Sequence, residues 1–184
     1  MVHIIALVAP SGAGKSTILS RLHHRIDGSR TAISATTRNK RPGEQHGEDY
    51  YYYSTEEFEQ LIENGDIFEY ERVYGKHYYG TLKDELEKRG EDDVALLDLD
   101  IRGAKNLKEA KGDEVLTVFI TVPSIPELRR RLEKRGTDDE ESIQRRLARA
   151  RKELKRANEC DVVVVNDVVE DAVQRIIKEY EARQ

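Results

Sequence analysis

The chain has 184 residues, which is the usual size of one compact domain with a sheet and several helices around a single core. Its 31 lysines and arginines against 36 aspartates and glutamates leave a formal net charge of -5, which argues against a general nucleic-acid-binding protein because such proteins are usually basic. No apolar run approaches the length of a membrane span, and the single cysteine, Cys160, rules out an intrachain disulfide and a thiolate metal cluster.

Apolar runs of strand length alternate with helical patterns along most of the chain. In chain order, the strand-like runs cover residues 3–9, 31–35 (a weaker one), 94–99, 115–122 and 162–165. The helical patterns cover residues 15–26, 55–64, 82–89, 102–108, 125–135, 141–159 and 169–182. Such alternation is typical of βαβ units. We therefore predict an α/β fold with a parallel sheet covered by helices on both faces.

Two segments interrupt this rhythm. Residues 38–80 hold eight of the nine tyrosines and are also rich in Glu and Gly, so they read as an inserted lobe. Within it, Ser54 and Glu57 form a capping-box pattern and Gly65 is a natural helix stop. Residues 136–141 form a polar turn between two arginine-rich helices, which is typical of a hinge or lid.

A strand, loop and helix follow one another near the N-terminus. The loop is Ala9, Pro10, Ser11, Gly12, Ala13, Gly14, Lys15, Ser16 and Thr17. In such a loop inward-facing backbone N–H groups hold the phosphates of a nucleoside triphosphate, Lys15 reaches the β- and γ-phosphates, and the Ser16 hydroxyl binds Mg²⁺. The usual pattern begins with Gly where this chain has Ala9, whose methyl group fits if φ is negative. A plain turn between strand and helix is the alternative.

With several later stretches, this loop resembles the guanylate kinases. The resemblance is carried by residues 9–17, 34–38, 41–44, 47–50, 78–81, 98–103, 135–138 and 165–167, and it covers nearly the whole chain. It implies a P-loop kinase that converts ATP and GMP, and also dGMP, into ADP and the nucleoside diphosphate with Mg²⁺. It further implies a core (residues 1–33, 82–135 and 145–184), an inserted GMP-binding lobe (34–81) and a small lid (136–144). We expect a cytoplasmic monomer or homodimer without nucleic-acid or membrane partners.

The resemblance implies an acceptor site that reads both the phosphate and the base of GMP. Arginine forks and tyrosine hydroxyls suit a phosphate dianion, and the N1–H and amino donors of guanine call for a carboxylate, the role of Glu69. Ser34 and Thr81 would add hydroxyl contacts to the base, and Glu44 would support the arginines. The expected residues are Ser34, Arg38, Arg41, Glu44, Tyr50, Glu69, Tyr79, Gly80, Thr81, Asp98 and Asp100. The alternatives are that Arg38 and Arg41 are solvated loop charges and that Glu69 points outward from an edge strand.

The remaining implied roles concern the metal, the lid and the adenine base. Asp98 ends an apolar run where P-loop kinases place an acid near Mg²⁺, and with Ser16 it would order the metal. Arg135 and Arg146 match lid positions that, with Lys15 and Arg38, would act in catalysis. Asn166 resembles the family residue beside adenine, and a turn-forming Asn-Asp pair is its alternative.

One sequence departure and one charged surface remain. Arg102 stands where the family commonly has Gln, so the contact made by that side chain is in doubt. The other arginines near the lid, Arg129, Arg130, Arg145 and Arg149, read equally well as a solvated helical face paired with glutamates.

Two other functions are compatible with parts of this pattern. A non-catalytic interaction module related to guanylate kinases would be expected to lose cations of the phosphate loop and lid, but Lys15 and Arg135 are present. A P-loop kinase for another phosphorylated acceptor would not need a guanine pocket, so Glu69 and Thr81 argue against it.

Overall fold

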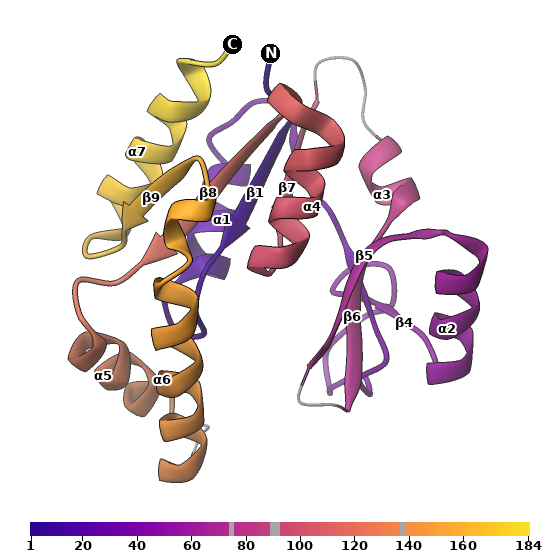
Figure 1. Ribbon diagram of the computed structural model, residues 1–184, viewed down its shortest axis with the longest axis horizontal. Coiled ribbons are helices and arrows are strands. Elements are labelled where there is room, and N and C mark those ends of the chain that lie inside the picture. The colour runs from indigo at the N-terminus through magenta and orange to yellow at the C-terminus, as the bar shows by residue number, and fades with distance from the viewer. Residues whose placement is uncertain (74–75, 89–92, 137–138) are drawn as a thin grey trace.

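The computed structural model describes residues 1–73, 76–88, 93–136 and 139–184 (Figure 1). Its larger sheet has five parallel strands in the order β2-β7-β1-β8-β9, which confirms the predicted parallel sheet. The strands are β1 (Ile4–Val8), β2 (Ser29–Thr31), β7 (Val94–Asp98), β8 (Val115–Thr121) and β9 (Val162–Val165). The described helices include none that is long and apolar enough to cross a membrane.

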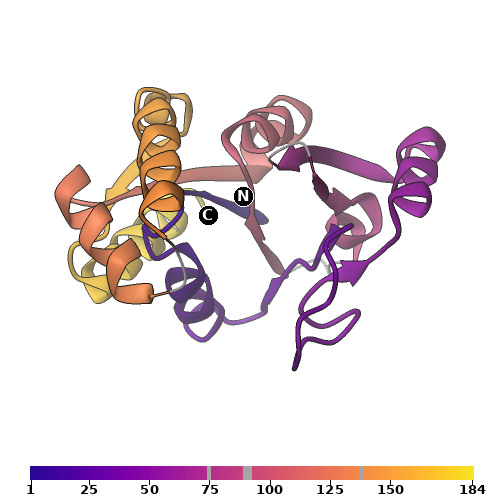
Figure 2. The ribbon, with the colours of Figure 1, turned by 90° about the horizontal axis from the view of Figure 1, so that it is seen from below.

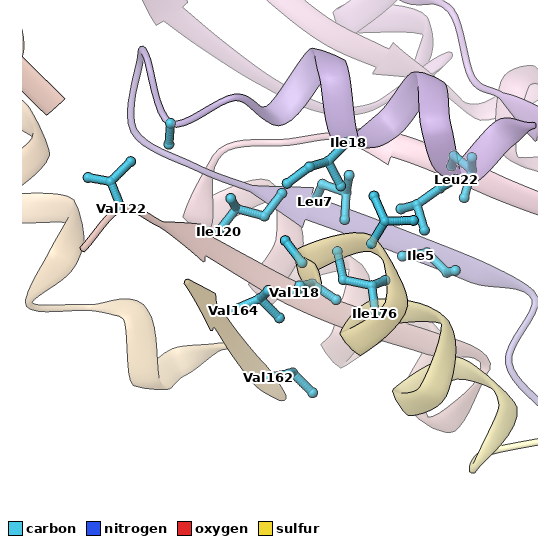
Figure 3. Close-up of a cluster of buried hydrophobic side chains, with 14 of the residues drawn as sticks. Ile5, Leu7, Ile18, Leu22, Val118, Ile120, Val122, Val162, Val164 and Ile176 are labelled. Carbon is cyan, nitrogen blue, oxygen red and sulfur yellow. The ribbon is translucent and has the colours of Figure 1, made fainter. Parts of the chain in front are cut away.

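Helices cover both faces of this sheet, because its central strands are apolar on both sides. All five residues of β1 are buried. Helices α1 (Lys15–His23) and α7 (Val169–Glu181) lie on one face and α4 (Ile101–Lys111) on the other (Figure 2). Side chains of α1, β1, β8, β9 and α7 meet in one apolar cluster (Figure 3), where each fully buried Leu or Ile contributes about 1.5–3 kcal/mol.

Two further helices pack against each other beyond strands β8 and β9: α5 (Ile125–Arg135) and α6 (Glu140–Leu154) (Figure 1). The side chain of Ser124 caps α5 by accepting from the Glu127 N–H, and Asp139 caps α6 in the same way from Ser142. Of the expected lid, residues 137–138 lie outside the described part. The other lid residues are Gly136, which ends α5, and the start of α6.

The lobe is a separate mixed sheet covered by helix α2, and helix α3 follows its last strand at the boundary with the core. Its strands run in the order β4-β3-β6-β5, and Phe58 of α2 packs beneath them with its ring stacked on Tyr78 at 5.1 Å between centroids. The capping box of Ser54 and Glu57 and the stop at Gly65 are confirmed. The elements are β3 (Ser34–Thr36), β4 (Tyr51–Tyr52), α2 (Thr55–Asn64), β5 (Ile67–Val73), β6 (His77–Leu82) and α3 (Lys83–Glu87).

The predicted strand at residues 31–35 is wrong, because the chain changes sheets there. The Ala32 N–H still donates to Leu96 of the parallel sheet, but the Ile33 N–H turns to the Glu85 side chain at 2.9 Å. Ser34 then pairs with Thr81 in the lobe. Two short strands, β2 and β3, therefore replace the single one.

Several helix ends also differ from the predicted ranges. Helix α1 ends at His23, where the His24 ring contacts the Ser20 carbonyl, and α4 is longer than expected at both ends. Helix α6 stops at Leu154, and residues 157–159 form a separate 3-10 turn, as do residues 112–114 before β8. Residue 89, the expected end of α3, lies outside the described residues.

Candidate active site

Two cavities of about 480 and 800 Å³ open beside the carboxyl ends of the parallel strands. This is where ligands bind in open α/β sheets. The smaller cavity is bounded by the core and the lobe, and the larger by the phosphate loop and helices α5 and α6. They join in one cleft, because both are lined by Ala9, Lys15, Ser16, Tyr50, Tyr79, Asp98, Arg149 and Glu153.

The phosphate loop is fixed by its own backbone and by strand β9. Gly14, the residue before α1, lies in the left-handed region at φ 91°, and a Cβ there would lie only 2.4 Å from the Asn166 amide nitrogen. That amide is buried and donates to the Ala13 carbonyl at 2.7 Å. Asn166 lines neither cavity and braces the loop through this hydrogen bond, and its contact with adenine stays a prediction. The methyl group of Ala9 packs against the main apolar cluster.

The two cavities meet at an ion pair between Lys15 and Asp98. Lys15 is the first residue of α1, and Asp98 ends β7 opposite Leu7 of the neighbouring strand. Ser16 follows Lys15 and lines both cavities. The sequence-based prediction that Lys15, Ser16 and Asp98 come together therefore agrees with the geometry.

Five arginines line the larger cavity: Arg149, which is shared with the smaller cavity, and four others. Arg146 of α6 donates to the Ser11 hydroxyl of the phosphate loop at 2.5 Å, and Arg135 ends α5. Arg41 reaches the cavity from the lobe, and within the described part of the chain no ion pair or hydrogen bond engages its side chain. Arg131, which sequence reasoning missed, donates to the Asn166 carbonyl and to Glu127. The larger cavity is lined by these arginines and Lys15 against the carboxylates of Asp98 and Glu153, and such an excess of positive charge attracts anions.

Three neighbouring strands of the lobe place Ser34, Thr81 and Glu69 in one row. The Thr81 hydroxyl is buried and donates to a Glu69 carboxylate oxygen at 2.7 Å. Glu69 lies on an edge strand but faces the smaller cavity, so the outward-pointing alternative is wrong. Burial raises the pKa of Glu69 from 4.5 to about 7, against the opposing Thr81 hydrogen bond and with the help of the Asp100 charge. Because the Thr81 hydroxyl is committed to Glu69, it orients this carboxylate rather than lining the cavity.

Helix α4 approaches Glu69 closely at Gly103, a contact that the sequence did not reveal. The Asp100 side chain caps α4 by accepting from the Gly103 N–H at 2.6 Å. A Cβ on Gly103 would lie 2.7 Å from a Glu69 carboxylate oxygen, well inside van der Waals contact. Asp100 therefore fixes the turn of helix that leaves room for Glu69.

Gly103→Ala should disturb this carboxylate without unfolding the protein. Ala favours a helix by about 1 kcal/mol over Gly, while the added methyl group pushes the carboxylate aside. For the GMP and ATP that the sequence resemblance implies as substrates, we expect kcat/KM for GMP to fall about tenfold with KM for ATP unchanged, because removing hydrogen bonds to a charged group costs about 1.5–3 kcal/mol. Steady-state kinetics and the melting temperature would check this, and an unchanged kcat/KM for GMP would contradict it.

An arginine and tyrosine cluster lies at the lobe end of the cleft. The Arg38 guanidinium donates two hydrogen bonds to Glu44, at 2.8 and 2.9 Å, and this pair together with the Arg41 N–H lowers the pKa of Glu44 to about 2. The Tyr50 and Tyr79 rings meet edge to face at 6.0 Å. Glu44 thus supports the arginines as predicted.

Some of the predicted site residues do not line either cavity: Ala13, Thr17, Arg38, Glu44, Thr81 and Asn166. Gly80 lines the smaller cavity and is also where strands β5 and β6 approach most tightly, since a Cβ there would lie 2.6 Å from the Glu69 carbonyl. Several lining residues were missed by sequence reasoning, and they include Glu71, Arg131, Arg149 and Glu153.

The donors available to a metal ion at the cleft are oxygens. Among the described residues there is no group of three or more His, Cys, Asp or Glu that could hold a metal ion. The Ser16 hydroxyl and the Asp98 carboxylate are hard ligands near the phosphate loop. Mg²⁺ prefers one or two such protein ligands together with phosphate and water oxygens, so this donor set fits it.

Comparison with known proteins identifies the family. The family model described as guanylate kinase matches residues 1–182. The chain belongs to the guanylate kinase family. Guanylate kinases of Salinibacter ruber and Porphyromonas gingivalis are 49% and 45% identical to it over 175 and 180 residues, covering 95% and 97% of this chain and 93% and 96% of theirs.

A solved structure supports the same assignment. The crystal structure of guanylate kinase from Anaplasma phagocytophilum aligns over 100% of this chain and 86% of its own, with a TM-score of 0.79 and 32% identity. The parallel sheet flanked by helices is thus the fold of a known guanylate kinase. The predicted membership of this family is confirmed.

Proposed function

We propose that this guanylate kinase transfers the γ-phosphoryl group of ATP to GMP, and also to dGMP, giving ADP and the nucleoside diphosphate. The observation that carries this proposal is one cleft with two ends. The phosphate loop forms one end, and the half-buried carboxylate of Glu69 lies at the other. Lys15 and Asp98 lie between them, where the reacting phosphoryl group would pass.

The ATP end of the cleft would bind the triphosphate through residues 9–17. The backbone N–H groups of the loop and the N-terminus of α1 would hold phosphate oxygens, and Lys15 would reach the β- and γ-phosphates. Ser16 and Asp98 would hold Mg²⁺, partly through water; bound there, the ion would neutralise charge on the phosphates. Asn166 would contribute by holding the loop in shape.

The acceptor end would bind GMP through complementary donors and acceptors. Arg41, Tyr50 and Tyr79 would bind the phosphate, and Arg38 would join them from its place beside Glu44. The Glu69 carboxylate would accept the N1–H and amino hydrogens of guanine. Ser34, Gly80 and Thr81 would shape the base pocket, and Asp98 and Asp100 would order the acceptor end.

Phosphoryl transfer needs positioning and charge stabilisation more than a covalent catalyst. Arg135 and Arg146 would close over the phosphates and stabilise charge in the transition state together with Lys15 and Arg38. We propose that residues 136–144 act as a lid between a core (1–33, 82–135 and 145–184) and a GMP-binding lobe (34–81). Helix α6 runs through the boundary between lid and core, so lid motion would be transmitted along this helix.

A panel of nucleoside monophosphates with Mg-ATP tests the reaction in a coupled assay for ADP. GMP and dGMP should be used well. AMP should be slower by at least about a hundredfold, because it would leave the half-buried acceptor Glu69 without its donors. Equal use of AMP and GMP would overturn the guanine assignment, and no turnover with any acceptor would favour a non-catalytic module.

A further inference from the structure

One ion pair joins the lobe to helix α6 across the cleft. A terminal nitrogen of Arg149 lies 3.3 and 3.2 Å from the two carboxylate oxygens of Glu71 on β5, and its Nε lies 2.7 Å from Glu153. The side chains of Arg149 and Glu71 are 38% and 32% exposed. Arg149 lines both cavities and Glu71 lines the smaller one, so the pair belongs to the wall of the cleft.

The position of Glu71 is unfavourable for an anionic substrate. Glu71 pairs with Tyr79 across strands β5 and β6, and it lies two residues from Glu69 on the same face. A carboxylate beside the place proposed for the GMP phosphate would repel that phosphate unless a cation neutralised it. Arg149 is that cation. Burial alone would lower its pKa, but the hydrogen bond to Glu153 and the charges of Glu71 and Glu153 raise the pKa above its ordinary value.

The same helix also reaches the phosphate loop. Arg146 lies three residues before Arg149, so both side chains project from one face of α6. Arg146 donates to Ser11 of the loop, and Arg149 binds Glu71 of the lobe. Helix α6 therefore contacts the ATP end of the cleft with one arginine and the acceptor lobe with the next.

We infer that Arg149 is a positioning residue: its ion pair with Glu71 couples the acceptor lobe to helix α6, and so to Arg146, and it shields bound GMP from the Glu71 carboxylate. This inference rests on the proposed GMP kinase reaction and adds a role that the sequence pattern did not suggest. It predicts two separate kinetic effects. Loss of the neutralising charge should affect GMP binding, and loss of the link should affect turnover.

Three variants distinguish the effect on GMP binding from the effect on turnover: Glu71→Gln, Arg149→Gln and the double variant. Arg149→Gln should raise KM for GMP about tenfold, because a close charge left unpaired is costly. Glu71→Gln should keep this KM within about twofold and lower kcat about fivefold, since coupling of 1–3 kcal/mol between sites is typical. The double variant should regain nearly the parent KM for GMP but keep the low kcat, a non-additive result.

Three further measurements sharpen the test. The raised KM of Arg149→Gln should shrink at high KCl, because salt screens the repulsion by Glu71. Arg145→Gln is the matched control on the same helix, since Arg145 pairs with the exposed Glu141 outside the cleft, and its kinetics should equal those of the parent. Melting temperatures should stay within a few degrees across the set.

The outcomes that would overturn the inference are distinct from those that bear on the reaction itself. Additive effects of the two substitutions on KM for GMP, or an unchanged kcat in Glu71→Gln, would overturn the role of Arg149. A parent protein that does not phosphorylate GMP would overturn the proposed function instead.

Discussion

Lys15→Ala should lower kcat for phosphoryl transfer by on the order of a thousandfold, the scale on which kinases depend on a cation at the transferring group. The side chain does two things at once. It supplies the positive charge at the phosphate loop, and it pairs with Asp98 at the junction of the two cavities. The substitution removes the first and leaves the Asp98 carboxylate unpaired beside the phosphates. A coupled assay for ADP formation measures the loss.

Two companion variants separate charge from structure in this experiment. Lys105→Ala removes an exposed lysine of α4 that pairs with Glu109 and lines neither cavity, so its kcat should equal that of the parent. In the double variant Lys15→Ala with Asp98→Asn, the repulsive carboxylate is gone, so binding of a fluorescent ATP analogue measured without Mg²⁺ should recover in part, while turnover with Mg²⁺ stays low. Turnover by Lys15→Ala near the parent level would contradict the phosphate-loop mechanism.

The elements that the sequence predicted well are those set by local pattern. The strand, loop and helix around Lys15 follow from an apolar run, two glycines and a helical period, and all three are present. Helices α2 and α5 have the predicted bounds, because Ser54 and Ser124 cap them and Gly65 and Gly136 end them. Local hydrogen bonds decide these ends, so a single sequence suffices.

The features that the sequence did not predict depend on partners far along the chain. The break between β2 and β3 is set by Glu85, whose carboxylate takes the Ile33 N–H and the Tyr51 hydroxyl. Gly103 is needed because a lobe carboxylate approaches α4 there. Each of these contacts is made only once two distant segments pack together.

The arginines show the same limit within one helix. Arg145 pairs with Glu141 one turn away, as a solvated helical face would. Arg149 also pairs with Glu153 on its own helix, but it reaches Glu71, which is 78 residues away in the sequence. The sequence carries one signal that distinguishes Arg149 from Arg145: Arg149 follows Arg146 by three residues, so it lies on the helix face that carries Arg146.

Glu69→Gln should impair the use of GMP and at the same time stabilise the folded protein. For function, the NH₂ group of Gln would face a donor of guanine, so one hydrogen bond would be lost, and the other would be made to a neutral oxygen in place of a charged one. A hydrogen bond to a charged group is worth about 1.5–3 kcal/mol, so kcat/KM for GMP should fall at least about a hundredfold, with KM for ATP unchanged. Glu63→Gln, an exposed site on α2 of the same lobe, is the matched control. Equal losses for GMP and ATP would remove Glu69 from the base site.

The raised pKa of Glu69 makes the stability part of this prediction depend on pH. Burial moves the pKa from 4.5 to about 7, so the unfolded chain releases this proton at lower pH than the folded chain does. The folded state therefore loses stability as pH rises from about 4.5 towards 7, and the full cost remains above 7. Glu69→Gln removes that cost, so its melting temperature should exceed that of the parent by more at pH 8 than at pH 5.

The same titration should appear in the kinetics of the parent. Guanine needs the ionised carboxylate, so below pH 7 GMP binding must expel the Glu69 proton. KM for GMP should therefore rise as pH falls, approaching a tenfold rise for each unit of pH below 7. The GMP phosphate titrates near pH 6 in both proteins, so the difference between the parent and Glu69→Gln isolates this carboxylate. A pH profile of KM with the same shape in the two proteins would show that Glu69 does not titrate in the base site.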